Sequence, residues 1–216
     1  MTRPTILLAG GGTGGHVFPL VAVADALSRL APEVSVVFVG TERGIETRVV
    51  RERGYELELM EVVPIRGGGW SGAARGVSRA AAALPAAWRL VGRRAPRAVL
   101  SVGGYAAGPV SLAARLSGVP LALLEPNAAI GLSNQLLARL VKRAYTAFPE
   151  TERHFSPGVV LRTGVPLRAG FGRRSYAGPE SVLQVLVLGG SQGARTLNEV
   201  IPRALAAARS PVRHRA

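Results

Sequence analysis

The chain contains no cysteine among its 216 residues, which excludes disulfide bonds and thiolate metal sites. Aromatic residues make up only 5% of the chain, and Lys142 is its one lysine. Long apolar runs are also missing, because no stretch reaches the ~18 uninterrupted apolar residues of a membrane-spanning helix. The N-terminus lacks the pattern of a signal peptide, since only a short apolar run separates Arg3 from the first glycines. We therefore expect a protein that is soluble or attached to a membrane surface.

Acidic residues are scarce relative to basic ones, and the formal net charge is +14. Such a charge commonly indicates nucleic-acid binding. However, the chain has no recognised nucleic-acid motif, and aromatic residues are not interleaved with the basic ones as in single-strand binding proteins. We therefore expect an anionic membrane surface and phosphate-bearing substrates as partners, and no nucleic acid.

Glycine is abundant, and it gathers in three similar loops. The first, Gly10–His16, reads Gly-Gly-Gly-Thr-Gly-Gly-His and follows the apolar run Ile6–Ala9; the others are Gly103–Pro109 and Gly189–Arg195. A strand, a glycine loop and a helix start place backbone N–H groups and the positive end of a helix against a phosphate. Three such loops predict an α/β protein that handles nucleotides or phosphates.

Apolar strand candidates alternate with helical stretches along the chain. The expected strands are 5–9, 34–39, 57–63, 98–102, 121–124, 143–146 and 182–188, and the expected helices are 17–30, 45–53, 73–94, 110–116, 132–140 and 196–208. This alternation predicts a Rossmann-like, mostly parallel sheet covered on both faces, with ligands at the carboxyl ends of the strands. The segment 149–179 has several Gly, Pro and Ser residues and is expected to be loop-like.

Two domains are predicted, the second of them incomplete. Residues 1–165 form the first domain, 166–180 a linker, and 181–216 the first strand, loop and helix of a second Rossmann-like domain. One strand and one helix cannot bury a sheet of their own. We therefore expect that the chain is truncated early in its second domain.

Polar residues at the predicted strand ends are the candidates for chemistry. His16 lies in the first turn after the glycines, where an imidazole suits a general base near a phosphate; the alternative is a histidine that only caps or packs at the turn. Glu125 and Asn127 follow a buried strand and are placed to hold sugar hydroxyls. Their alternative role is a turn around Pro126 that Asn127 caps.

Two further patterns leave alternatives open. Gly10-x-Gly12-x-x-Gly15 with Glu42 after the second strand also satisfies the dinucleotide fingerprint of a nicotinamide-dependent oxidoreductase. The stretch Arg66–Arg97 carries seven arginines and no acid, with Trp70 and Trp88 among them. It is expected either to lie on an anionic bilayer or to be a solvated helix packed on the sheet, and Pro85 is expected to break or kink it.

Four segments together resemble the MurG family, the bacterial UDP-N-acetylglucosamine:undecaprenyl-pyrophosphoryl-muramoyl-pentapeptide N-acetylglucosaminyltransferases. They are residues 8–19, residues 101–109, Glu125-Pro126-Asn127 and residues 188–198. The resemblance covers essentially the whole chain. It departs from the usual family pattern at Leu124 and Pro126, in place of His and Gln, and at Val165, in place of Asn.

The resemblance implies a GT-B fold with the active site between two Rossmann-like domains, needing no cofactor and no metal. The implied reaction transfers N-acetylglucosamine from UDP-N-acetylglucosamine to the muramoyl 4-hydroxyl of lipid I, giving lipid II with inversion at the sugar carbon. It takes place at the cytoplasmic face of the plasma membrane, during peptidoglycan precursor synthesis. Because the family's second domain continues well beyond Ala216, we expect little or no transferase activity from this chain alone, which would leave an acceptor- or membrane-binding fragment.

The resemblance also assigns roles to residues. His16 is the expected catalytic base. The expected substrate-binding residues, which contact the acceptor pyrophosphate or the nucleotide sugar, are Thr13, Gly14, Gly15, Tyr105, Glu125, Asn127, Asn134, Arg168 and Ser191.

Overall fold

The computed structural model describes residues 3–62, 70–104, 106–172, 186–189 and 194–207, and within 70–81 only the backbone. The chain divides into two compact units, Met1–Phe171 and Gly172–Ala216. The predicted boundaries at 165 and 180 remain predictions.

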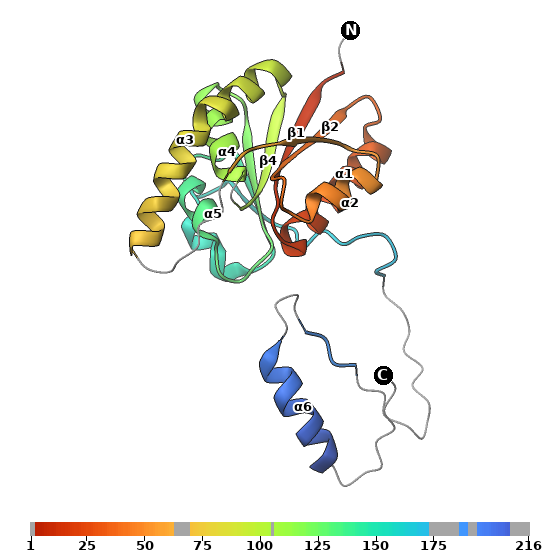
Figure 1. Cartoon of the computed structure of the whole chain (residues 1–216). Coiled ribbons are helices and arrows are strands. Elements are labelled where there is room, and N and C mark those ends of the chain that lie inside the picture. Colours follow the sequence, from red (N-terminus) through yellow and green to blue (C-terminus); the bar gives the residue numbers. More distant parts are fainter. Residues whose placement is uncertain (1–2, 63–69, 105, 173–185, 190–193, 208–216) are drawn as a thin grey trace. The chain divides into compact units, whose positions relative to one another are not determined.

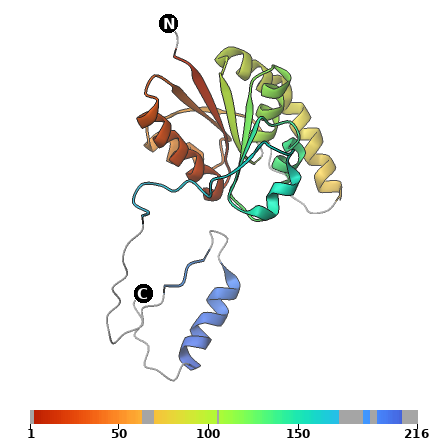
Figure 2. The ribbon, with the colours of Figure 1, turned by 180° about the vertical axis from the view of Figure 1, so that it is seen from behind.

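The first unit is a parallel α/β sheet with helices on both faces (Figures 1 and 2). Its strands lie in the order β3-β2-β1-β4-β5-β6-β7, so the strand order reverses between β1 and β4. The strands are β1 Thr5–Gly10, β2 Ser35–Gly40, β3 Glu56–Leu59, β4 Ala98–Gly103, β5 Leu121–Glu125, β6 Arg143–Thr146 and β7 Val160–Arg162. The helices are α1 Gly14–Leu30, α2 Glu46–Glu52, α3 Trp70–Arg94, α4 Ala107–Leu116, α5 Leu132–Leu137 and the 3-10 helix η1 Pro149–His154. The predicted fold class is confirmed.

Alternate residues along the central strands supply two separate cores. Leu7 and Ala9 of β1 belong to the core under α3, α4 and α5. Leu8 belongs to the other core, with Leu20 of α1 and Val50 of α2. Because successive side chains of a strand point to opposite faces, one apolar run serves both cores.

The structure overturns one sequence prediction for this unit and excludes one alternative of another. The segment 149–179, predicted to be loop-like, contains η1 and the strand β7, which pairs with β6 from Ala144↔Val160 to Thr146↔Arg162. Helix α3 does not break at Pro85 but continues to Arg94, with Ala83, Ala87 and Leu90 packed into the core on both sides of the proline. A kink at Pro85 stays a prediction.

The described part of the second unit is α6, Arg195–Ala207, and the short segment Leu186–Gly189. This segment is not a strand, whereas the rest of the predicted strand 182–188 lies outside the described residues. None of the side chains described in α6 is buried.

Candidate functional site

The first glycine loop joins β1 to α1 at the carboxyl edge of the sheet. Thr13 is the N-cap residue of α1 in an extended conformation, but its side chain makes no capping hydrogen bond, and the first turn holds no acid. The first N–H groups of a helix have no intrahelical partner, and the helix dipole makes this end positive. The amides of Gly14 and Gly15 therefore lie at this positive end of the helix, and phosphate binding by them remains a prediction.

His16 completes this first turn and is half-buried. Its Nδ1 lies 3.2 Å from the carbonyl oxygen of Gly11. Because a carbonyl oxygen only accepts, Nδ1 must carry the proton in this hydrogen bond. The other ring nitrogen, Nε2, then keeps a lone pair that can take a proton from a substrate.

The second glycine loop packs directly against the first. Gly10 and Gly103 are register partners at the ends of β1 and β4, and Gly103 and Gly104 have φ values of 93° and 95°. A Cβ atom on Gly104 would lie 3.0 Å from the Gly11 oxygen and 3.6 Å from His16 Nδ1. The two loops thus meet where the strand order reverses, which is where ligands bind in open α/β sheets. Tyr105 lies outside the described residues.

Glu125, at the end of β5, is 1% exposed, and both its oxygens accept hydrogen bonds from the protein. Oε1 accepts from the backbone N and from Nδ2 of Asn127 at 3.1 and 3.0 Å. Oε2 accepts from Asn134 Nδ2 at 2.9 Å and from Gly131 N at 3.2 Å. Glu125 therefore shapes the β5–α5 loop and leaves the Asn127 side chain exposed. Contacts of Glu125 and Asn127 with a substrate remain predictions.

Asn134, on α5, links this loop to the second glycine loop. The residue is 1% exposed, and its Oδ1 has no hydrogen-bond partner among the residues that the structure describes. A Cβ atom on Gly103 would lie 3.1 Å from this oxygen. A buried acceptor without a partner therefore lies beside the second glycine loop, and ligand binding by Asn134 remains a prediction.

Arg168 lies beside the first turn of α1. Its guanidinium is 4.4 Å from the ring centre of Phe18 and 5.6 Å from that of Phe171. Phe18 in turn lies close to Gly14, where an added Cβ would be 3.1 Å from the ring. Stacking on Phe18 therefore holds a cation next to the first glycine loop. Ser191, in the third loop, lies outside the described residues.

Sequence reasoning missed one residue of this region, Glu46. The structure buries it completely at the start of α2, where its oxygens accept from Gly12 N and Thr41 N at 2.9 and 2.8 Å. Glu42, which the dinucleotide interpretation selects, is exposed. The available signal was the pair of glycines just before Glu46, since Gly40 and Gly44 lack the side chains that would fill its place.

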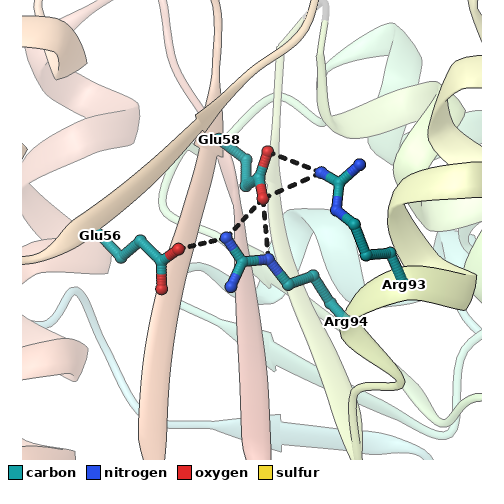
Figure 3. Close-up of polar contacts among 4 residues, drawn as sticks. All are labelled: Glu56, Glu58, Arg93 and Arg94. Atoms are coloured by element: carbon teal, nitrogen blue, oxygen red, sulfur yellow. Dashed lines mark hydrogen bonds and ion pairs between the residues drawn. The ribbon is translucent and has the colours of Figure 1, made fainter.

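The arginine-rich helix α3 ends in an ion-pair cluster with the edge strand β3 (Figure 3). Arg93 Nη2 lies 3.0 Å from both oxygens of Glu58, and Arg94 pairs with Glu58 and Glu56. Burial would raise the pKa of Glu58, but hydrogen bonds from Arg94 and Arg93 outweigh it and hold the pKa below its ordinary value. Two of the predicted membrane-facing charges are thus neutralised within the protein.

Earlier in the same helix, Trp88 is 51% exposed and is followed by the exposed Arg89. Residues Arg66–Gly69 lie outside the described residues, and only the backbone is described from Trp70 to Ala81. Among the helices described, none is long and apolar enough to cross a bilayer.

A separate apolar hollow of about 370 Å³ lies along the middle of the sheet, on its α1 side. Its lining includes Leu8, Leu27, Leu100 and Tyr145, so it lies away from the glycine loops at the strand ends. The polar groups that the sequence selects are not part of its lining, and we place the candidate site at the carboxyl edge.

Residues 6–146 match the glycosyltransferase family 28 N-terminal domain. A Sorangium cellulosum protein named UDP-N-acetylglucosamine--N-acetylmuramyl-(pentapeptide) pyrophosphoryl-undecaprenol N-acetylglucosamine transferase is 60% identical over 95% of this chain and 51% of its own length. A relative of the same name from Anaeromyxobacter dehalogenans is 46% identical over 93% of the chain and 53% of its length. The chain thus spans about half the length of these curated relatives.

The crystal structure of Acinetobacter baumannii MurG is similar to this chain with a TM-score of 0.73 and 32% identity. The similarity covers 96% of this chain and 56% of the MurG chain. A more distant structure, that of a Listeria monocytogenes protein described as a putative UDP-N-acetylglucosamine 2-epimerase, shares only the fold. It is 12% identical, with a TM-score of 0.57, and the similarity covers 74% of this chain and 45% of the Listeria chain. These similarities remove the nicotinamide-oxidoreductase alternative. The chain belongs to the MurG family of N-acetylglucosaminyltransferases and carries its glycosyltransferase family 28 N-terminal domain.

Proposed function

We propose that this chain forms the acceptor-side half of an inverting transferase that makes lipid II. In the reaction, N-acetylglucosamine passes from UDP-N-acetylglucosamine to the muramoyl 4-hydroxyl of undecaprenyl-pyrophosphoryl-muramoyl-pentapeptide. The observation that carries this proposal is His16, which lies between two glycine loops and whose Nε2 keeps its lone pair because Nδ1 donates to Gly11.

His16 serves as the general base in this proposal. Its Nε2 accepts the proton of the acceptor hydroxyl while the hydroxyl oxygen attacks the sugar carbon and the UDP diphosphate leaves. The uncapped amides of Gly14 and Gly15 stabilise negative phosphate oxygens at the positive end of α1. Arg168, stacked on Phe18, adds a fixed positive charge at the same end of the helix.

The remaining substrate-binding assignments belong to this proposal as well. Asn134 borders the second glycine loop, and Glu125 holds both Asn134 and the exposed Asn127 in the β5–α5 region; we assign all three to the substrate. Thr13, Tyr105 and Ser191 are assigned by the family resemblance.

The donor half of the site is incomplete in this chain under our proposal. The chain spans about half the length of its relatives, and the described part of its second unit contains a single helix. We therefore propose that the chain alone has little or no transferase activity. We also propose that the whole protein works at the cytoplasmic face of the plasma membrane, where basic residues meet anionic lipid.

The test is transfer of labelled N-acetylglucosamine to a lipid-linked muramoyl-pentapeptide. The chain would be compared with a chimera that continues it through the second domain of the Sorangium cellulosum relative, and with the same chimera carrying His16→Ala. We expect transfer by the chimera, at least roughly 100-fold slower transfer by its His16→Ala variant, and none by the chain alone.

Other outcomes separate the alternatives. Robust transfer by the 216 residues would contradict the incomplete donor site. A chimera that binds the lipid acceptor but transfers nothing would instead support a non-catalytic acceptor-binding role.

A further inference from the structure

One peptide group, that between Gly11 and Gly12, joins His16 to Glu46. Its carbonyl oxygen, on Gly11, accepts the hydrogen bond from His16 Nδ1 at 3.2 Å. Its N–H, on Gly12, donates to Glu46 Oε2 at 2.9 Å. The carboxylate of α2 and the imidazole of α1 therefore hold opposite ends of the same planar group.

Glu46 is held in place by several contacts besides its hydrogen bond to Gly12. The residue is fully buried, and its Oε1 accepts from Thr41 N at 2.8 Å and from Thr41 Oγ1 at 3.0 Å. Glycines on three segments surround it: a Cβ atom on Gly11, Gly40 or Gly44 would lie 2.2, 2.5 or 1.9 Å from a Glu46 side-chain atom. The fold thus keeps a pocket of the size of this side chain directly behind the first glycine loop.

We propose that Glu46 is a positioning residue for His16 and acts through the Gly11–Gly12 peptide group. The carboxylate orients the peptide, so the Gly11 carbonyl points at the imidazole. Hydrogen bonds in a chain polarise one another, which makes that carbonyl a stronger acceptor for Nδ1–H. The chain of bonds therefore selects the ring tautomer whose Nε2 is free to act as the base.

The same arrangement divides the amides of the loop between two tasks. The Gly12 N–H is bonded to Glu46 and is not available to a phosphate. Phosphate binding is thereby left to the first turn of α1, at Gly14 and Gly15. This inference rests on the proposed function, because it takes His16 to be the base.

Glu46→Gln tests the proposal with little change of volume. The amide oxygen of the new side chain is expected to accept from the two Thr41 donors, so that its NH2 group faces the Gly12 N–H. An NH2 group only donates, and the hydrogen bond from Gly12 is therefore lost. Nitrogen-15 NMR of the 216-residue chain reads the ring tautomer of His16 without any catalysis. We expect the Nδ1–H tautomer in the unsubstituted chain and a mixture of both tautomers in Glu46→Gln.

Val50→Ala is the matched control, because Val50 is fully buried on the same helix and belongs to the core rather than the loop. It is expected to lower the stability while leaving the His16 tautomer unchanged. If Glu46→Gln is folded by circular dichroism and keeps the unsubstituted tautomer, the proposal is overturned. A tautomer change in Val50→Ala would overturn it too, because general loosening of α2 would then suffice.

Transfer by the chimera gives the second readout. For Glu46→Gln we expect kcat to fall about tenfold, a part of the roughly 10²- to 10⁴-fold that a positioned base contributes. The KM for UDP-N-acetylglucosamine should change by less than about threefold, because Glu46 acts on the base rather than on donor binding. An unchanged kcat would contradict the proposal. If the unsubstituted chimera transfers nothing, the proposed function fails, and the tautomer measurement still decides the role of Glu46.

Discussion

Carboxylates in two regions of this domain, the loops at the strand ends and the edge strand β3, are held by different kinds of donor. Glu46 and Glu125, at the carboxyl edge of the sheet, are buried and bonded to backbone amides, to the Thr41 hydroxyl and to asparagine side chains. Glu58, on the edge strand β3, is partly exposed and pairs with the guanidinium groups of Arg93 and Arg94 (Figure 3). Neutral donors hold a carboxylate in place without bringing a second positive group to the site. The positive end of α1 is then left to bind the ligand. The arginine pairs tie a helix end to a strand and contribute only modestly to stability.

The largest loss in the free energy of unfolding is expected when a buried carboxylate is replaced and its hydrogen-bond donors lose their acceptor. Glu125→Ala would remove the acceptor of two backbone amides and of Asn127 Nδ2, and would leave the buried Asn134 Nδ2 only its longer bonds to the carbonyl oxygens of Val102 and Leu124. Each unsatisfied buried donor costs about 1–3 kcal/mol, so we expect the free energy of unfolding to fall by about 3 kcal/mol. Urea unfolding of the chain measures it. A loss below about 1 kcal/mol would mean that solvent replaces Glu125 and that the loop is not held as described.

A smaller loss is expected when a side chain is forced into the Glu46 pocket. A Cβ atom on Gly44 would lie 1.9 Å from Glu46 Oε2. We expect Gly44→Ala to lower the free energy of unfolding by roughly 2 kcal/mol through overpacking. The control is Gly92→Ala on α3, where a Cβ atom meets nothing within 4 Å and alanine is expected to stabilise the helix by up to about 1 kcal/mol.

A double-mutant cycle sharpens this test. In a Glu46→Ala background the clash disappears, so Gly44→Ala should then cost less than about half of its effect in the original chain. Fully additive effects would show that Gly44 and Glu46 do not compete for the same space.

The smallest change in the free energy of unfolding is expected when an exposed ion pair is removed. Glu58→Gln should lower the free energy of unfolding by less than about 1 kcal/mol at neutral pH, and less still in high salt. The pKa of Glu58 is lowered in the folded state, so its contribution is complete above the ordinary value of 4.5 and is lost as the pH falls through the lower folded value. The stability of Glu58→Gln should therefore fall less between about pH 5 and pH 3 than that of the original chain. Parallel pH curves for the two proteins would contradict this account of Glu58.

The sequence predicted those parts of the domain in which local pattern and tertiary structure agree. The run Ile6–Ala9 followed by glycines fixed the position of β1, the first loop and His16, because strand periodicity and glycine geometry are local signals. The strand β7 was missed because it has three residues at the sheet edge and lies within a Gly- and Pro-containing segment. The family resemblance added the reaction, which the pattern of strands and helices could not supply.

Glu46 shows what remained beyond sequence reasoning. Apart from the glycines at 40 and 44, nothing local distinguishes it from Glu42, four residues earlier and exposed. Only the packing of α2 behind the first loop brings its carboxylate to the Gly12 amide, 34 residues away in the chain. The same holds for Gly104, where an added Cβ would lie 3.0 Å from the Gly11 oxygen only because β4 pairs with β1.

The most direct test of the central claim is the tautomer of His16 in the unsubstituted chain. A nitrogen-15 correlation spectrum at a pH where the imidazole is neutral distinguishes a protonated Nδ1 from a protonated Nε2. The account predicts the proton on Nδ1, bonded to Gly11, and a free Nε2 facing the acceptor. A proton on Nε2 would contradict both the Glu46–peptide–His16 chain and the assignment of His16 as the base.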